Sequence, residues 1–358
     1  MFCLIPYLFS SFSLEGSVAM SARLKESFLT KKRISFPLSI NVSVIGCGVW
    51  GQNHARVFNE LPNVKLISVI DLNEATAKDV SRRYNTSYAS DPAEAIADPE
   101  VDAVTICTPT ITHTELALHA IEAGKHVLVE KPMTNTVAEA EALIRAARKN
   151  GVHLAVGFVE RFNPAVHEAY RLISEGAIGD IILAHTKRVS RWPVRIGDVG
   201  VIKDLAVHDI DIVNKLFGVE AGSVFATAGN IQHSFEDYAN IMMCFKGKRG
   251  AFIETNWLTP RKVRTLTITG TEAIINVEYI TQTLTLESER QMVQPFIPNA
   301  EPLRLELESF VNSIMRDTPP VVTGEDGLRA LRVCEAAIES ARTGNKVVLN
   351  PEMCDPPI

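Results

Sequence analysis

From about residue 40 onward, short apolar runs alternate with segments that carry apolar residues at helical spacing. The apolar runs predict buried strands at residues 42–45, 64–70, 101–106, 126–129 and 152–156. The segments between them predict helices at residues 54–61, 75–84, 115–123 and 137–149. A chain in which strands alternate with helices forms a parallel sheet with right-handed crossovers. We therefore expect an α/β domain over residues 40–158.

The pattern changes after residue 157. Period-two alternation predicts strands at residues 180–189, 223–228, 240–245, 250–256, 264–269, 273–279 and 281–286. Helical spacing occurs at residues 165–174, 205–216, 301–316 and 327–343. Strands that follow one another without crossover helices pair mostly antiparallel, and such a sheet can leave one face open. We expect an α+β domain over residues 159–350, built on an open, mostly antiparallel sheet.

Residues 1–39 precede this pattern. Residues 2–9 are apolar, but no basic segment comes before them and they contain Pro6. Met20 offers a second plausible start. We interpret residues 1–39 as a disordered extension or a start assigned too early, in preference to a secretory signal. No segment approaches the roughly 20 apolar residues that a membrane-spanning helix needs, so we expect no membrane partner.

Composition narrows the class of protein. Of the 358 residues, 46% are apolar and 22% are charged, which is typical of globular domains. The net charge of −6, with no basic stripe, argues against a nucleic-acid partner. Six cysteines are scattered without a CxxC spacing. They predict reduced thiols in a cytoplasmic protein, and neither a disulfide framework nor a zinc site.

A glycine-rich turn joins the first strand to the first helix. Its sequence is Gly46-Cys47-Gly48-Val49-Trp50-Gly51. Glycines at this spacing permit a tight turn, let backbone N–H groups approach a pyrophosphate, and leave room for helix–strand packing. The N-terminus of the following helix favours the phosphate charge. The turn therefore predicts dinucleotide binding by a Rossmann domain.

Asp71 ends the second strand, about 20 residues after the glycine turn. A carboxylate there can accept hydrogen bonds from both hydroxyls of the adenosine ribose, and it would repel a 2′-phosphate. Leu72 and Asn73 supply no compensating charge, so NAD is favoured over NADP, although Arg82 and Arg83 lie on the next helix. The alternative is a structural turn in which Asp71 caps a helix.

Glu130-Lys131-Pro132 directly follows the apolar run 127–129. Open α/β sheets bind ligands beyond the carboxyl ends of their strands, which is where this tripeptide falls. Pro132 fixes its own φ and biases Lys131 toward an extended backbone, which aims the ammonium group. Taken alone, a solvated lysine in a turn is the simpler interpretation.

Asp204 and His208 lie four residues apart, on one face of a helix that begins near Asp204. Oxidation of a carbinol needs a proton acceptor beside the hydroxyl and a cation near the developing alkoxide, roles that His208 and Lys131 can fill. Asp204 would hold the sugar or the imidazole. One alternative is that Asp204 caps the helix and His208 belongs to the core. Another is a metal site of His208, Asp209 and Asp211, but no second histidine is present, and we expect no metal.

Four motifs in this order resemble the Gfo/Idh/MocA oxidoreductases. They are the glycine turn, Thr108-Pro109 with His113, Glu130-Lys131-Pro132, and Asp204-x-x-x-His208. The resemblance covers about residues 42–348. It implies a Rossmann domain, an open antiparallel sheet that makes a homodimer or homotetramer, and a catalytic triad of Lys131, Asp204 and His208. We expect NAD contacts from Gly46, Gly48, Val49, Trp50, Gly51, Asp71, Thr108, Pro109, His113, Glu130 and Lys131.

Two further segments, residues 160–164 and 197–211, are similar to the UDP-N-acetylglucosamine 3-dehydrogenases and related UDP-sugar-acid dehydrogenases. Arg161 and Asn163 follow the last Rossmann strand and would face the same crevice as Lys131. A guanidinium there suits a carboxylate or diphosphate, and an amide suits sugar hydroxyls or an acetamido group. We expect both to bind substrate together with the catalytic triad. The alternative is that Glu160 and Arg161 form an ion pair that braces the domains, with Pro164 starting a helix.

The sequence thus predicts an NAD-dependent dehydrogenase that oxidises the C3 hydroxyl of a small-molecule nucleotide sugar, a UDP-linked N-acetylaminosugar. His208 would take the hydroxyl proton while Lys131 stabilises the alkoxide, and which of the two is the base stays open. The alternatives are an inositol or free-sugar dehydrogenase of the same family and a catalytically silent NAD-binding regulator. Arg161 suits a sugar with or without a C6 carboxylate.

Overall fold

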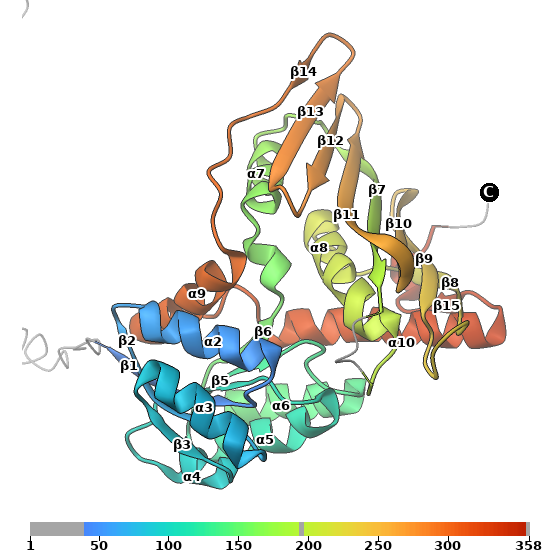
Figure 1. The fold of residues 1–358 in the computed structure, drawn as a ribbon. Helices are drawn as coiled ribbons and strands as arrows, with labels where there is room; N and C mark the ends of the chain where they lie inside the picture. The colour runs from blue at the N-terminus through green and yellow to red at the C-terminus, as the bar shows by residue number, and fades with distance from the viewer. Residues whose placement is uncertain (1–38, 193–196, 356–358) are drawn as a thin grey trace, which may run out of the picture. The chain divides into compact units, whose positions relative to one another are not determined.

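The computed structural model describes residues 39–192 and 197–355 (Figure 1). The interpretation of residues 1–39 as an extension falls, apart from Ser39, outside the described residues.

The first half of the described chain alternates strands with helices. Its elements are β1 (Ile40–Ile45), α2 (Val49–Glu60), β2 (Val64–Ile70), α3 (Glu74–Tyr84), β3 (Ser87–Ala89), α4 (Pro92–Ala97), β4 (Ala103–Ile106), η1 (Thr110–Thr112), α5 (His113–Glu122), β5 (His126–Glu130), α6 (Val137–Asn150), β6 (Leu154–Gly157) and η2 (Val159–Phe162). The six strands form one parallel sheet in the order β3-β2-β1-β4-β5-β6. The strand order reverses between β1 and β4, where doubly wound sheets open a crevice at the strand ends. The predicted Rossmann domain is confirmed.

The second half is built on one large sheet. Its elements are α7 (Pro164–Ser174), β7 (Ile181–Arg191), the π-helical turn η3 (Ile202–Ala206), α8 (Val207–Phe217), β8 (Ser223–Gly229), β9 (Tyr238–Phe245), β10 (Arg249–Asn256), β11 (Leu258–Gly270), β12 (Ala273–Glu278), β13 (Thr283–Ser288), β14 (Met292–Val293), α9 (Pro302–Arg316), α10 (Gly324–Thr343), β15 (Val347–Val348) and η4 (Pro351–Met353). The strand order is β14-β13-β12-β11-β7-β10-β9-β8-β15. Only the pair β7–β10 is parallel among these described strands, so the predicted mostly antiparallel sheet is confirmed.

The two closing helices return to the Rossmann domain, a contact that the sequence pattern does not predict. Leu307 and Phe310 of α9 share a core with Val42 and Val44 of β1. The start of α10 lies against β6, where a Cβ on Gly327 would approach the Val156 side chain to 3.0 Å. Figure 1 shows α9 beside α2 and α10 running beneath the large sheet. Burial of these apolar faces joins the two domains.

Short elements account for the main differences from the predicted pattern. The strand β3 has three residues and α4 has six, too few to show a repeat in the sequence. The strand β11 begins at Leu258, six residues before the predicted start, because polar and exposed residues such as Arg261 hide its alternation.

Candidate active site

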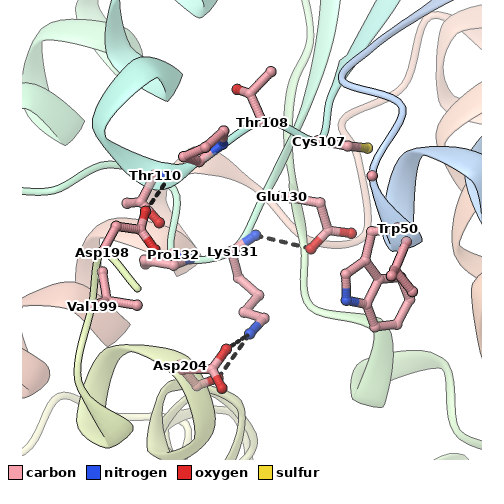
Figure 2. Close-up of a pocket in the computed structure, with 13 residues that line it drawn as sticks. Trp50, Cys107, Thr108, Thr110, Glu130, Lys131, Pro132, Asp198, Val199 and Asp204 are labelled. Atoms are coloured by element: carbon pink, nitrogen blue, oxygen red, sulfur yellow. Dashed lines mark hydrogen bonds and ion pairs between the residues drawn. The ribbon is translucent and has the colours of Figure 1, made fainter. Parts of the chain in front are cut away.

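A pocket lies at the carboxyl ends of β1, β4 and β5, facing the segment that leads into α8 (Figure 2). Its walls come from both domains. The lining residues are Gly48, Val49, Trp50, Cys107, Thr108, Pro109, Thr110, Glu130, Lys131, Pro132, Asp198, Val199 and Asp204. The structure therefore brings the glycine turn, the Thr108-Pro109 segment, Lys131 and Asp204 together, as the sequence predicts.

The glycine turn has the geometry that a dinucleotide needs. Gly46 has a φ of 94°, and a Cβ there would lie 2.8 Å from the backbone of Cys107. A Cβ on Gly51 would lie 1.7 Å from the Gly46 carbonyl oxygen. Gly48 has nothing within 4 Å of its Cβ position, and it precedes α2 without a side-chain cap. Open space beside uncapped N–H groups at a helix N-terminus fits a pyrophosphate.

Asp71 holds this turn in place. Its Oδ2 accepts a hydrogen bond from the backbone N–H of Cys47 at 2.7 Å, and its Oδ1 accepts one from Asn73 at 2.8 Å. The carboxylate is thus fixed at the end of β2, beside the turn. Its contact with the adenosine ribose stays a prediction.

Glu130 belongs to a buried hydrogen-bonded chain beneath the pocket. Its Oε1 lies 3.1 Å from Nε2 of His54, whose Nδ1 lies 2.9 Å from the Thr105 hydroxyl. The backbone N–H of Lys131 donates to the other oxygen of Glu130 at 3.2 Å. These contacts fix the strand end from which the lysine side chain projects. No motif in the sequence points to His54, although its place on the buried face of α2 is an available signal.

Lys131 and Asp204 form a buried ion pair across the pocket. The Lys131 Nζ donates to the Asp204 Oδ1 at 2.7 Å and to the Asp204 backbone carbonyl at 2.8 Å (Figure 2). The side chains are 8% and 5% exposed. The peptide bond between Lys131 and Pro132 is cis. A cation held in this way at the pocket wall can stabilise a developing negative charge on a bound hydroxyl.

The helix that carries Asp204 begins earlier than predicted. The π-helical turn spans Ile202–Ala206, and the Asp204 backbone N–H already donates to the Gly200 carbonyl at 3.0 Å. Asp204 is therefore inside the helix, and the alternative in which it caps the helix is wrong. π-helical turns inside α-helices are frequent at functional sites.

His208 follows one turn later and is 8% exposed. The ring of Phe158 packs edge-on against its imidazole, with 6.2 Å between ring centroids. His208 does not line the pocket itself, in contrast to Lys131 and Asp204. Its role as proton acceptor stays a prediction.

His113 connects the two pocket loops. Its Nδ1 lies 3.0 Å from the Pro132 carbonyl and its Nε2 lies 2.9 Å from the Thr108 carbonyl. Burial lowers the pKa of His113, so the ring is neutral and only one of the two contacts is a hydrogen bond at a time. His113 thus positions the loops and does not line the pocket.

Asp198 lines the pocket from the second domain, a role that the sequence motifs do not predict. Its Oδ2 accepts a hydrogen bond from the Thr110 backbone N–H at 2.8 Å. Figure 2 shows Asp198 and Val199 on the same side of the pocket as Pro132. The distance of 88 residues between the two partners leaves no local signal in the sequence.

Arg161 and Asn163 lie outside the pocket. Arg161 donates to Asp211 at 2.5 and 2.7 Å and to Asp326 at 3.3 Å, which ties η2, α8 and α10 together. Asn163 caps α7 and donates to the Tyr279 carbonyl at 3.0 Å. Both side chains are buried, so the structure does not bring them to Lys131. The bracing alternative describes Arg161 better, although its partner is Asp211 and not Glu160.

The thiols at the pocket are not suited to nucleophilic chemistry. Burial, aided by Asp71, raises the pKa of Cys47 to about 12. Burial also raises the pKa of Cys107 well above its usual value. A thiol is a weak nucleophile until it loses its proton.

Within residues 39–192 and 197–355, no three histidine, cysteine or acidic side chains are grouped to hold a metal ion. Asp209 pairs instead with Arg188, and Asp211 with Arg161. Across the same residues, none of the helices has the length and apolar character needed to span a membrane.

Both domains match models of one known protein family. Residues 40–158 match the model of an oxidoreductase family with an NAD-binding Rossmann fold, and residues 171–349 match the α/β C-terminal domain of the same family. The scyllo-inositol 2-dehydrogenase (NAD(+)) of Bacillus subtilis (strain 168) is 31% identical, over 87% of this chain and 96% of its own.

A second relative carries a different substrate name. The UDP-N-acetylglucosamine 3-dehydrogenase of Acidithiobacillus ferrooxidans is 28% identical, over 84% of this chain and 96% of its own. A crystal structure of the enzyme of that name from the same organism superposes with a TM-score of 0.80 at 27% identity. It covers 85% of this chain and 98% of its own.

Proposed function

Because the chain belongs to the Gfo/Idh/MocA oxidoreductase family and is an NAD-dependent dehydrogenase of sugar-type hydroxyls, we propose a specific substrate for it. The substrate is a UDP-linked N-acetylaminosugar, and the reaction is oxidation of its C3 hydroxyl. One observation carries the proposed chemistry: the Lys131 ammonium group, held by Asp204, faces the pocket that the glycine turn borders.

The chemistry that bound NAD would supply in the proposed reaction is acceptance of the hydride from the carbinol carbon. Gly46, Gly48 and Gly51 leave the room that its pyrophosphate needs, and Asp71 lies where its ribose hydroxyls would bind. Lys131 donates a hydrogen bond to the substrate oxygen and stabilises the alkoxide as the hydroxyl proton departs.

We assign the departing proton to His208, one helical turn after Asp204. Asp204 holds the ammonium group of Lys131 at the pocket wall through the ion pair of 2.7 Å. Because Lys131 already has a carboxylate and a carbonyl as partners, electrostatic stabilisation suits it better than proton acceptance.

The substrate assignment is supported by the UDP-N-acetylglucosamine 3-dehydrogenase relative and its crystal structure, both aligned over most of the chain. Inositol oxidation is the second candidate, favoured by the higher identity of the scyllo-inositol dehydrogenase. A neutral cyclitol would use the same lysine and histidine.

A substrate panel separates the two candidates. Purified protein is mixed with NAD and either UDP-N-acetylglucosamine or myo- and scyllo-inositol, and NADH absorbance is followed. We expect NADH from the nucleotide sugar at a kcat/KM well above that for either inositol. The reverse order would replace the proposed substrate by a cyclitol, and no NADH from any of them would contradict both.

The proposed assembly is a homodimer or homotetramer formed through the open face of the large sheet. Large apolar side chains on neighbouring strands are exposed there, including Leu183 at 50%, Met242 at 49% and Phe252 at 38%. Exposed apolar groups in contiguous strands are typical of subunit interfaces. Light scattering of wild type and Leu183→Glu measures the association, and a monomeric wild type would contradict it.

We also propose a cytoplasmic location. The five described cysteines are free thiols, and Cys47 and Cys334 are buried. Free thiols are typical of proteins in a reducing compartment. Fractionation of the source cells tests this location.

A further inference from the structure

A second cluster of charged side chains lies between η2, α8 and the strands β7 and β11. At its centre is Arg188, which is 1% exposed. Arg188 donates to Glu160 at 2.8 Å and to the two carboxylate oxygens of Asp209 at 2.8 and 3.0 Å. Arg264 donates to the same oxygen of Glu160 at 2.9 Å. Lys262 lies two residues before Arg264 on β11.

This cluster carries an excess of positive charge. Three cations, Arg188, Arg264 and Lys262, meet two carboxylates, those of Glu160 and Asp209. Among the described residues, Lys262 makes no ion pair or hydrogen bond, so one positive charge is left without a partner.

Glu306 is a further carboxyl group near Glu160, and it does not balance the excess. It is buried, and both of its oxygens lack a hydrogen-bond partner in the described part of the chain. Burial raises the pKa of Glu306 well above its usual value, with a further contribution from Glu130. Burial therefore favours the protonated, neutral form of Glu306.

The unpaired charge lies at the open side of the cluster. Arg188 is buried, the Arg264 side chain is 29% exposed, and Lys262 is exposed. Partial burial and the neighbouring Arg264 lower the pKa of Lys262. Partial burial and Arg188 likewise lower the pKa of Arg264. A bound anion would relieve this repulsion.

The cluster adjoins the catalytic histidine. Asp209, which Arg188 holds, is the residue after His208. Glu160 follows two residues after Phe158, whose ring packs against the His208 imidazole. Figure 1 shows α8 lying along the face of the sheet where β7 and β11 run side by side. The charged cluster therefore begins beside His208 on α8 and reaches the surface at Arg264 and Lys262.

We propose that Lys262 and Arg264 form an anion subsite that binds the acidic group of the substrate, a diphosphate or a carboxylate, while the Lys131 pocket holds the hydroxyl to be oxidised. On the buried side of the cluster, Arg188 holds Glu160, and Glu160 accepts a hydrogen bond from Arg264. Lys262 contributes the unpaired charge. A neutral inositol has no group for this subsite. The inference rests on the proposed function, because it gives the reason why a nucleotide sugar is preferred over a cyclitol.

The test uses Lys262→Gln in the full chain, with NAD at saturation. Lys262 is exposed and unpaired, so its replacement leaves the fold intact. Arg261→Gln is the matched control, because Arg261 is the adjacent exposed cation on the same strand and, among the described residues, takes no part in the ion pairs of the cluster. Lys262→Arg tests rescue by charge. Calorimetric titrations use UDP, UDP-N-acetylglucosamine and its C6 uronic acid as probes, and steady-state kinetics give KM and kcat.

A hydrogen bond to a charged group contributes about 1.5–3 kcal/mol, so Lys262→Gln should weaken binding about tenfold to hundredfold. The loss should appear in KM with kcat little changed, and Lys262→Arg should restore most of it. Equal losses for all three probes identify the diphosphate as the bound group. A loss confined to the uronic acid identifies the carboxylate.

The inference and the proposed function fail separately. If UDP-N-acetylglucosamine is oxidised and Lys262→Gln matches Arg261→Gln for every probe, the subsite is wrong and the function stands. If the UDP probes bind with dependence on Lys262 but none is oxidised, the subsite stands and the proposed function is wrong.

Discussion

The substitution Lys131→Ala isolates the contribution of the buried ion pair at the pocket. The charged atoms of Lys131 and Asp204 lie 2.7 Å apart, and their side chains are 8% and 5% exposed. Removing one partner of such a pair costs about 3–5 kcal/mol, because the other charge stays buried. In the described structure Oδ2 of Asp204 has no hydrogen-bond partner, so little else would stabilise the carboxylate. We expect the free energy of unfolding to fall by about this amount.

Asp204→Asn is the matched variant. It removes the negative charge, while Lys131 keeps the backbone carbonyl of residue 204 at 2.8 Å. The loss of stability should therefore be smaller than for Lys131→Ala. The double variant should be more stable than Lys131→Ala alone, because no unpaired charge remains buried. Thermal unfolding of the four proteins measures these differences.

The same four proteins test catalysis. Loss of a positioned electrostatic group lowers kcat by about 10²–10³. The affinity for NAD, measured by fluorescence titration, should stay near that of wild type, because the glycine turn and Asp71 are unchanged. Wild-type turnover by Lys131→Ala, or stability equal to wild type, would refute the reasoning.

Gly51→Ala should destabilise the protein, because its methyl group would lie 1.7 Å from the Gly46 carbonyl oxygen. At Gly48 an added methyl group would meet nothing within 4 Å. Gly48→Ala should therefore keep the unfolding temperature of wild type and lose affinity for NAD. Thermal unfolding and calorimetry measure both, and unchanged NAD binding by Gly48→Ala would contradict the assigned pyrophosphate site. Asp71→Asn should raise the KM for NAD about tenfold and reduce the preference of the enzyme for NAD over NADP. If the ratio of kcat/KM with NAD to kcat/KM with NADP is unchanged, Asp71 does not select the cofactor. Glu306 has a folded-state pKa well above its unfolded value, so its contribution to stability is present at low pH and is lost as pH rises through the raised pKa. Glu306→Gln should therefore lose less stability than wild type as pH rises from the ordinary glutamate pKa of 4.5 toward the raised pKa of Glu306. Parallel pH profiles of the unfolding temperature would contradict this.

Local sequence patterns predict much of the fold and the centre of the site. The glycine turn and Lys131 are each fixed by their own strand end, so a motif read beside a predicted strand places them correctly. Asp204 and His208 lie on one helix, so their spacing of four residues is also informative. In each case the position of the residue follows from the order of neighbouring elements along the chain.

Contacts between distant segments could not be predicted in this way. Arg161 follows the last Rossmann strand, but its direction is set by Asp211, 50 residues further along the chain. Asp198 reaches the pocket through a hydrogen bond to Thr110, 88 residues away. His54 meets Glu130 only because the parallel sheet brings α2 over β5. Such partners depend on how distant elements pack, within one domain or between the two, and periodicity does not encode that packing.

Transfer of the C3 hydrogen of the sugar tests the central claim most directly. UDP-N-acetylglucosamine carrying deuterium at C3 is incubated with the purified protein and NAD, and the NADH is analysed by mass spectrometry. We predict that the NADH contains the deuterium and that the sugar product is the 3-keto compound. Unlabelled NADH, or none at all, would contradict oxidation at C3 of a UDP-linked aminosugar.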